Sequence, residues 1–164
     1  VVYTSNCVRT LQTAKYLLEK QNLKVNIDER FDERRPGKPN SDKVPDWYER
    51  QFFDENYKTE GGESQAEVRQ RMSEAFEEVV KDNKGKRIAI FSHGNAITFF
   101  LLKWCKLESV NINRNLCLSF NNKIVFNKRI NSPDVFKITL NDKNEVIDIE
   151  NIEFEDLDFD DFNK

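Results

Sequence analysis

The only histidine of this chain, His93, lies in the motif FSHGN at residues 91–95. An apolar stretch precedes the motif and a helix-like apolar pattern follows it, which predicts a strand, a tight turn and a helix. The imidazole would then lie at the carboxyl end of a strand, where ligands bind in open α/β sheets. The first backbone N–H groups of the next helix attract anions. We therefore expect His93, Gly94 and Asn95 to bind an anion, although a buried structural histidine fits the same pattern.

Arg9 is a second candidate, in the segment TSNCVRTLQTA at residues 4–14. The pattern predicts a strand, a polar turn carrying Ser5, and a helix whose first turn holds Arg9. A helix dipole disfavours a cation at the N-terminal end of a helix. The placement of Arg9 there is explained if an anion lies between the guanidinium and the helix N-terminus. A guanidinium would then add paired hydrogen bonds to a phosphate or carboxylate. The alternative is a solvated surface arginine.

Glu33 is the third candidate, because it follows a predicted strand and precedes a long irregular segment. A carboxyl group in such a place can act as a general acid and base. It could equally be a surface carboxylate paired with Arg34 or Arg35.

Composition limits the classes of function. The chain has 164 residues, 38% hydrophobic and 34% charged, with a net charge of -3, which is typical of a soluble, cytoplasmic, globular protein. We expect no nucleic-acid partner, since no basic stripe stands out, and no membrane partner, since no apolar run is long enough. The three cysteines lack metal-site spacing, so no metal or other cofactor is expected.

The elements that must position these residues alternate between strand and helix. Strands are predicted near residues 1–5, 23–27 and 87–91, and helices near 6–20, from Ser64, and at 96–106. Expected helix caps are Asn6, Ser64 with Glu67, and Gly85. Further strands follow at 116–120, 123–127, 135–140 and 146–152, the first two joined by a hairpin turn at Asn121-Asn122. The alternation predicts an α/β domain over residues 1–152 with a mostly parallel sheet. Residues 153–164 are expected to be a flexible acidic tail, or an acidic interaction tail.

Residues 28–62 read as a long excursion that contains a short aromatic helix around 47–53. Long structured loops over an α/β site are often lids. Trp47, Tyr48 and Phe52 are therefore candidate lid residues, and ordinary core packing is the alternative.

In this order, the motifs resemble the histidine phosphatase superfamily, with its phosphoglycerate mutase-like fold. The matching segments are Ser5 to Arg9 with QTA at 12–14, RFDERRPG at 30–37 with Glu33, GGES at 61–64 with Arg71 further along, and SHG at 92–94. The resemblance implies a three-layer α/β/α architecture and a small phosphorylated substrate. It also leaves a homodimer possible.

The same resemblance implies the roles of the candidate residues. Arg9 would hold the transferred phosphoryl group and His93 would stabilise its oxygens. Glu33 would protonate the leaving oxygen and later activate water. Ser5, Gly94 and Asn95 would complete the phosphate site.

One departure from the family pattern is large. The family's nucleophile is a histidine in an Arg-His-Gly motif on its first, central strand, and this sequence lacks that motif. We therefore expect a chain truncated at its N-terminus and inactive as given, derived from an active phosphomonoesterase. The alternatives are phosphoglycerate mutase-type transfer and a non-catalytic module that binds phosphoryl ligands.

Overall fold

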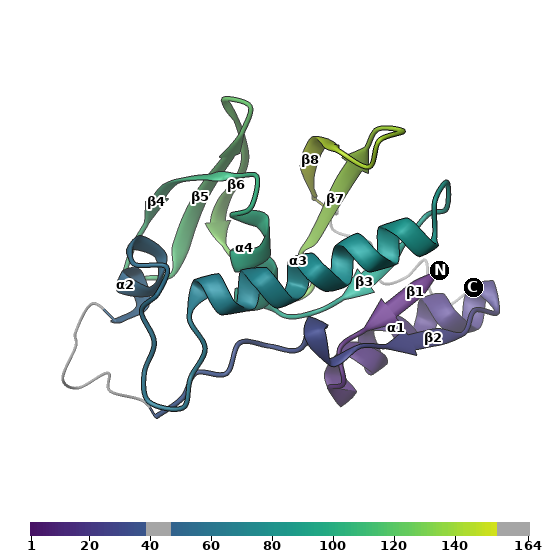
Figure 1. Ribbon diagram of the computed structural model, residues 1–164, viewed down its shortest axis with the longest axis horizontal. Helices are drawn as coiled ribbons and strands as arrows, with labels where there is room; N and C mark the ends of the chain where they lie inside the picture. Colours follow the sequence, from purple (N-terminus) through teal and green to yellow (C-terminus); the bar gives the residue numbers. More distant parts are fainter. Residues whose placement is uncertain (39–46, 154–164) are drawn as a thin grey trace, which may run out of the picture.

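The computed structural model describes residues 1–38 and 47–153, and its helices and strands alternate along the first part of the chain (Figure 1). In chain order they are β1 (Val2–Thr4), α1 (Val8–Gln21), β2 (Val25–Ile27), the 3-10 turn η1 (Glu29–Phe31), α2 (Trp47–Phe53), α3 (Gln65–Asp82), β3 (Ala89–Phe91), α4 (Gly94–Leu101), β4 (Lys106–Val110), β5 (Asn115–Phe120), β6 (Lys123–Arg129), β7 (Val135–Leu140) and β8 (Val146–Ile152).

A small parallel sheet carries the sequence motifs. Its order is β2-β1-β3, and β1 pairs in parallel with both neighbours. The central position of β1 explains its apolar character, since Val2 and Thr4 are fully buried. Helix α1 packs against β1 and β3. The predicted α/β class with a parallel sheet is therefore confirmed. β3 pairs along one edge only, and no strand of the described part pairs with its other edge.

The last five strands are antiparallel and form two further sheets, β4-β5-β6 and β7-β8. The predicted hairpin is present, with Asn121 and Asn122 both at positive φ, as a tight two-residue turn requires. Strand β4 was not predicted: the helix expected to reach Lys106 ends at Leu101, and the following residues pair with β5 instead.

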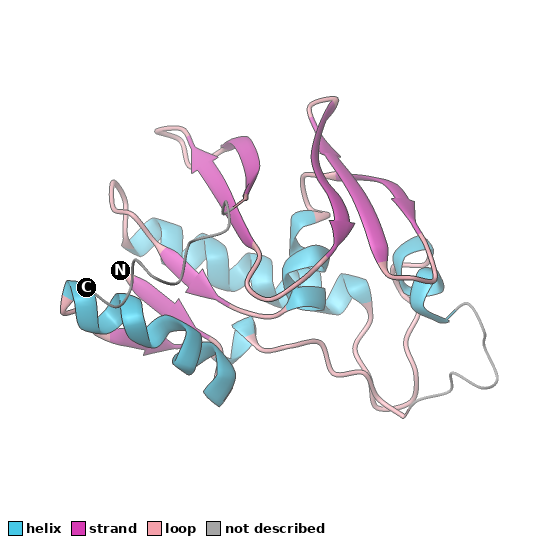
Figure 2. Ribbon diagram, turned by 180° about the vertical axis from the view of Figure 1, so that it is seen from behind, coloured by secondary structure: helices cyan, strands magenta, loops and turns pink. Residues whose placement is uncertain are grey.

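Helix α3 runs across the middle of the molecule, with both antiparallel sheets on one side and β1, β2 and α1 on the other (Figures 1 and 2). α3 packs along α4. The buried core joins α3, α4 and the antiparallel strands through residues such as Val68, Met72, Phe99, Leu118 and Ile149. The site residues near the start of α4 therefore rest on the best-packed part of the fold.

One of the three predicted helix caps is confirmed, and the other two are wrong. Ser64 caps α3, and its hydroxyl and the Glu67 carboxylate form the predicted capping box. The prediction of Asn6 as the cap of α1 is wrong: Cys7 occupies that position, and its carbonyl accepts from the N–H groups of Thr10 and Leu11. The Asn6 N–H donates to Asp32 Oδ1 at 2.7 Å. Gly85 is not the C-cap of α3 either. The helix ends at Asn83, and Gly85 lies in the next turn with φ of 76°.

Two glycines bring the ends of the long excursion together. Gly37 has φ of 69°, and an added Cβ there would collide with the backbone of Gly62 at 2.6 Å. A Cβ on Gly62 would in turn lie 2.9 Å from the Pro36 carbonyl oxygen. Next to this crossing, the Lys38 N–H donates to the Glu60 carbonyl at 3.0 Å. We call this crossing of residues 36–38 and 60–62 the pinch.

Two predictions fall wholly or partly outside what is described. The acidic tail at 153–164 lies outside the described residues except for Glu153. The part of the excursion at 39–46 also lies outside them. Within the described residues, no helix is long and apolar enough to cross a membrane.

Candidate functional site

His93 links β3 to α4 and is the N-cap residue of α4. Its ring is buried, with 6% of the residue exposed, and both nitrogens have partners. Nε2 lies 2.8 Å from the Ser5 hydroxyl, and Nδ1 accepts a hydrogen bond of 2.9 Å from Arg9 Nε–H. The short strands β1 and β3 run side by side, so the residues that follow them meet at one end of the sheet. The structure thus brings Ser5, Arg9 and His93 together, as the sequence predicts.

The hydrogen bonds decide the protonation of the ring. Because Nδ1 accepts from a guanidinium, it carries no proton, so the ring is neutral with its proton on Nε2, donated to Ser5. Burial lowers the pKa of His93 from its ordinary value, and the charge of Arg9 lowers it further, whereas Glu33 opposes the shift. In this state the imidazole has no free N–H to offer a ligand.

Glu33 reaches the same end of α4 from the other side. Its Oε1 accepts hydrogen bonds from the Ala96 N–H at 3.1 Å and from the Arg34 N–H at 2.8 Å. The carboxylate therefore takes the place of an N-cap, since the side chain of His93 does not cap the helix. Oε2 accepts no hydrogen bond from any described residue, which leaves it available for a proton.

The first turn of α4 keeps donors free. Among the described residues, no carbonyl or side chain accepts from the N–H groups of Gly94 and Asn95. Gly94 also allows a close approach, because an added Cβ would lie only 2.8 Å from Ile130 Cγ2. A guanidinium and free N–H groups at a helix N-terminus, beside a buried histidine, are groups that can donate hydrogen bonds to an anion.

The comparisons with known proteins agree with this geometry. The family model of the histidine phosphatase superfamily (branch 1) matches residues 1–124. This chain is a member of the histidine phosphatase superfamily. No curated protein matches it closely.

Several solved structures share the fold of this chain. Native mycobacterial glucosyl-3-phosphoglycerate phosphatase superposes with a TM-score of 0.55 at 22% identity, covering 63% of this chain and 57% of that one. Its complex with inorganic phosphate gives 0.56, with the same identity and coverage. Bacillus stearothermophilus YhfR gives 0.54 at 19% identity, covering 77% and 71%. The chain thus spans a little over half the length of the mycobacterial protein.

A network of hydrogen bonds around Arg71 holds the segment that carries Glu33. Arg71 on α3 donates from Nε and Nη2 to the Glu63 carboxylate, at 3.0 and 3.1 Å. Its remaining donors reach the carbonyls of Arg30, Asp32 and Glu33 at 2.7 to 3.3 Å. Burial alone would raise the pKa of Glu63, but Arg71 and the Arg35 N–H hold it below its usual range. The signal was present as the GGES motif and Arg71, eight residues apart.

A second missed residue supports Ser5. The Thr10 hydroxyl lies 2.8 Å from that of Ser5 and donates to the Cys7 carbonyl at 2.7 Å. Thr10 is buried one turn into α1, where the sequence offered only a polar residue on an amphipathic helix. Behind the site, Ser92 donates to the Phe31 carbonyl at 2.7 Å and ties the His93 turn to η1.

The predicted lid residues have different environments. Phe52 is buried and its ring packs on Phe99 of α4, 5.2 Å between centroids, so it belongs to the core. Tyr48 is half-buried between Phe52 and Arg114, and Trp47 meets Tyr48 edge-on. Only Tyr48 and Trp47 remain candidates for contact with a ligand.

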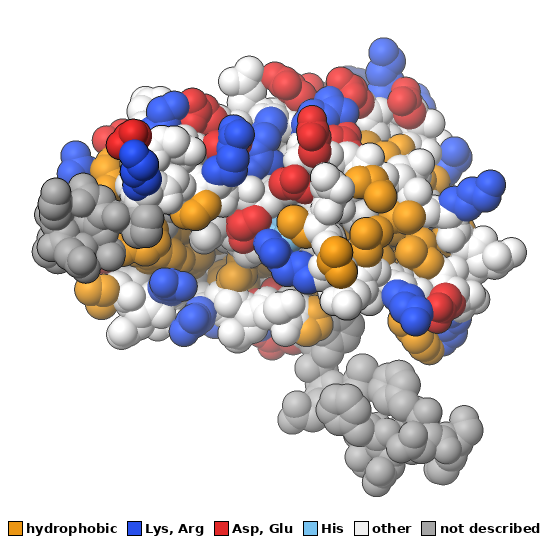
Figure 3. Space-filling view, turned by 90° about the horizontal axis from the view of Figure 1, so that it is seen from below, with side chains coloured by type: hydrophobic (Ala, Val, Ile, Leu, Met, Phe, Trp, Pro, Cys, Tyr) orange, Lys and Arg blue, Asp and Glu red, His pale blue; other side chains and the backbone are white. Residues whose placement is uncertain are grey.

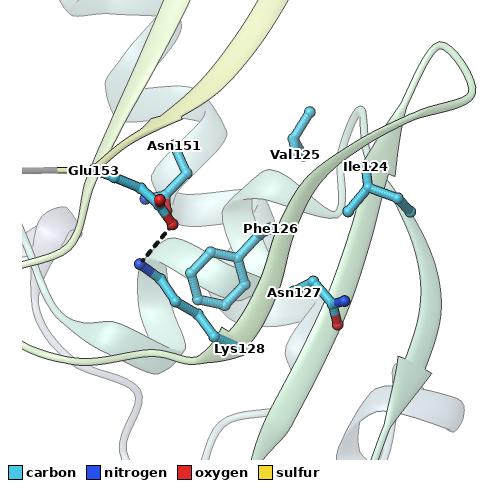
Figure 4. A pocket seen from close by; sticks show the side chains of 7 residues that line it. All are labelled: Ile124, Val125, Phe126, Asn127, Lys128, Asn151 and Glu153. Atoms are coloured by element: carbon cyan, nitrogen blue, oxygen red, sulfur yellow. Dashed lines mark hydrogen bonds and ion pairs between the residues drawn. The ribbon is translucent and has the colours of Figure 1, made fainter.

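Two cavities lie away from these residues. One, of about 230 Å³, lies between β6 and β8, where Lys128 donates to Glu153 (Figure 4). Another, of about 570 Å³, lies beside the start of α3 and is lined by residues that include Arg35, Lys58 and Glu74. Neither is lined by His93, Arg9 or Glu33. Seen from below, charged side chains of both signs crowd the middle of the face, beside an apolar patch (Figure 3).

Proposed function

We propose that this chain is the larger part of a phosphomonoesterase that hydrolyses a small phosphorylated metabolite through a phosphohistidine intermediate. The observation that carries the proposal is the meeting of Arg9 and His93 at the N-terminus of α4, with an Arg9–His93 hydrogen bond of 2.9 Å. No carboxylate neutralises Arg9 within the described residues. A phosphoryl group is the anion that such a family site would hold.

The residues divide the work of phosphoryl transfer. The substrate's phosphoryl group would displace His93 from Arg9 and accept hydrogen bonds from the guanidinium and from the N–H groups of Gly94 and Asn95. Freed from Arg9, Nδ1 of His93 can take a proton and donate to a phosphoryl oxygen. A proton on Glu33 Oε2 would pass to the leaving ester oxygen as the P–O bond breaks and a P–N bond to the nucleophile forms. Glu33 then takes a proton from the water that cleaves the P–N bond.

The nucleophile must come from outside the residues of this sequence, which contains a single histidine. We infer that a strand-loop-helix unit with Arg-His-Gly pairs with the free edge of β3 and brings its histidine beside His93. The residues of β3 are each half-buried, although the central strand of an α/β sheet is covered on both faces and edges. The same half of the molecule exposes apolar residues, including Val8, Tyr16 and Ile27.

Hydrolysis of 4-nitrophenyl phosphate at mildly acidic pH tests the proposal. The assay compares this chain with the same chain preceded by an Arg-His-Gly unit, and with a control unit in which the histidine is asparagine. Turnover by the restored chain alone, lost again on His93→Asn, is the expected result. Transfer to an added alcohol in place of water would support the covalent intermediate, whereas interconversion of 3-phosphoglycerate and 2-phosphoglycerate would indicate a mutase. Turnover that persists with the asparagine unit would overturn the phosphohistidine mechanism.

A second candidate is a module that binds phosphoryl ligands without turnover, favoured by the absence of a nucleophilic histidine from the sequence. In that case no unit restores hydrolysis, and inorganic phosphate still shifts the amide signals of Gly94 and Asn95 in NMR spectra.

A further inference from the structure

Two arginines that the mechanism does not use meet next to α2. Arg114 precedes β5 and Arg129 ends β6, and the antiparallel pairing of Asn115 with Arg129 brings them together. The Arg114 guanidinium carbon lies 5.4 Å from the centre of the Tyr48 ring. Burial raises the pKa of Tyr48, and both arginines are near enough to oppose that rise. We call Tyr48, Arg114 and Arg129 the arginine pair site.

Neither arginine is neutralised within the described part of the chain. The ion pairs there involve other basic residues, and no hydrogen bond from either guanidinium is formed. Two like charges held near one another are unfavourable unless an anion joins them. Arg114 also has φ of 65°, a left-handed conformation in which asparagine or glycine is preferred over arginine. The backbone strain thus accompanies an arginine that has no partner.

The arginine pair site lies beside the anion site. Residue 130 follows Arg129 directly, and its side chain rests against Gly94, next to His93. From the other side, Tyr48 packs on Phe52, which packs on Phe99 of α4. The two sites therefore both border α4: Arg129 adjoins a residue that contacts Gly94 at the start of the helix, and Tyr48 is linked through Phe52 to Phe99 in its last turn.

A buried polar group on α2 adds to this picture. Gln51 follows Tyr48 by three residues, so both lie on the same face of the helix. It is 1% exposed, and neither end of its amide has a partner among the described residues. An amide buried without partners is unfavourable, and an ordered water would satisfy it.

We propose that Arg114 and Arg129, with Tyr48, bind a second anionic group on the leaving group of the substrate. The inference rests on the proposed function and makes it narrower. The substrate class is a phosphomonoester whose leaving group carries a carboxylate or a second phosphate. The esterified phosphoryl group would lie at Arg9 and His93, and the second anion would lie between the two guanidinium groups. The Tyr48 ring would contact the carbon skeleton between them.

Binding to the intact chain tests the proposal with matched probes. These are phenyl phosphate against 4-carboxyphenyl phosphate, and fructose 6-phosphate against fructose 1,6-bisphosphate, all by NMR titration. Signals of Gly94 and Asn95 report the first site, and the Nε–H signals of Arg114 and Arg129 report the second. We expect at least one doubly anionic probe to bind about tenfold more tightly than its partner and to shift both sets.

Variants distinguish loss of the arginine pair site from unfolding and from loss of the anion site at Arg9 and His93. Arg114→Asn suits the left-handed backbone, and Arg129→Gln removes the other charge. The control, Lys123→Gln, removes an exposed charge from the opposite end of β6. We expect the double variant to abolish the tenfold preference. Its affinity for phenyl phosphate should stay within about twofold of the parent, and its unfolding midpoint should not move, as exposed sites allow.

Two outcomes distinguish failure of the arginine pair site from failure of the proposed phosphoryl site. If both doubly anionic probes bind no more tightly than their partners, or the double variant keeps the preference, the second anion site is overturned and the proposed function stands. If inorganic phosphate leaves Gly94 and Asn95 unshifted while doubly anionic probes still shift Arg114 and Arg129, the phosphoryl site is overturned and the arginine pair site stands as a separate anion site.

Discussion

Arg71 and Arg9 use their guanidinium groups in opposite ways. Arg71 uses all five of its N–H donors: two go to the Glu63 carboxylate and three to the carbonyls of residues 30, 32 and 33. Arg9 donates once, to the neutral ring of His93, and its terminal nitrogens have no partner among the described residues. The protein itself satisfies every N–H donor of Arg71, whereas most donors of Arg9 are left for a ligand.

Arg71 supports the segment that carries Glu33, and Arg9 is placed to bind an anion. The charge of Arg71 is neutralised by a carboxylate that is 8% exposed, so the pair fixes the segment carrying Glu33. The charge of Arg9 stays exposed beside a buried imidazole whose pKa it lowers. Stability should therefore depend on Arg71, and anion affinity on Arg9.

The largest effect is expected from Arg71→Leu. The substitution leaves the buried Glu63 carboxylate without its main partner and frees three carbonyls, so we expect about 3 kcal/mol less stability in urea unfolding. Arg69→Gln on the same helix breaks an exposed pair with Glu55 and should cost about 0.5 kcal/mol. Equal losses in the two variants would show that the Arg71 network is not a support.

Arg9→Gln should change binding more than stability. Losing the guanidinium should weaken inorganic phosphate binding about tenfold, as measured by calorimetry. The urea midpoint should hardly move, because the Arg9 side chain is exposed. Lys15→Gln, which removes an exposed charge from the same helix, serves as the control. A loss of stability without loss of affinity would reverse the contrast with Arg71.

Acid should destabilise the protein through His93. Its folded pKa is lower than the ordinary value of 6.5, so below that pH the unfolded chain binds more protons than the folded one. The neutral ring's contribution is complete above pH 6.5 and is lost as the pH falls through the lowered folded value. We expect the parent to lose about 1 kcal/mol relative to His93→Gln between about pH 7.5 and pH 5. Parallel curves for the two proteins would contradict the neutral ring.

The smallest effect is expected from Thr10→Val. The change removes the hydroxyl behind Ser5 and should cost about 0.5 kcal/mol in unfolding free energy. Thr13→Val on the same helix removes an exposed hydroxyl that donates to the Arg9 carbonyl and should cost less. If both variants behave alike, the Ser5–Thr10 bond adds nothing to the support of His93.

Features encoded by neighbouring residues were predictable. The strand-turn-helix around His93, the capping box of Ser64 and Glu67, and the Asn121-Asn122 turn depend on residues within a few positions of each other. The meeting of Ser5, Arg9 and His93 was also predictable, because adjacent parallel strands end at one edge of a sheet. The ordered motifs supplied the family.

Features that depend on contacts between residues far apart in the sequence were not predictable. The Asn6 N–H donates to Asp32, 26 residues away, and the cap of α1 is Cys7. Strand β4 pairs with β5, whereas the local pattern predicted a helix up to Lys106, the first residue of that strand. The saturation of Arg71 depends on carbonyls 38 to 41 residues away, and no local pattern indicates which carbonyls those are.

The pinch has a consequence for how such a chain can change over time. Gly37 and Gly62 hold the two ends of the excursion in contact, and the Lys38–Glu60 hydrogen bond and ion pair close it. Lengthening a segment whose ends are already joined costs little extra chain entropy. The stretch between the two glycines therefore behaves as an exchangeable cassette: insertions, deletions or a transplanted helix could alter what the molecule accepts while Arg71, Glu33 and His93 keep their places.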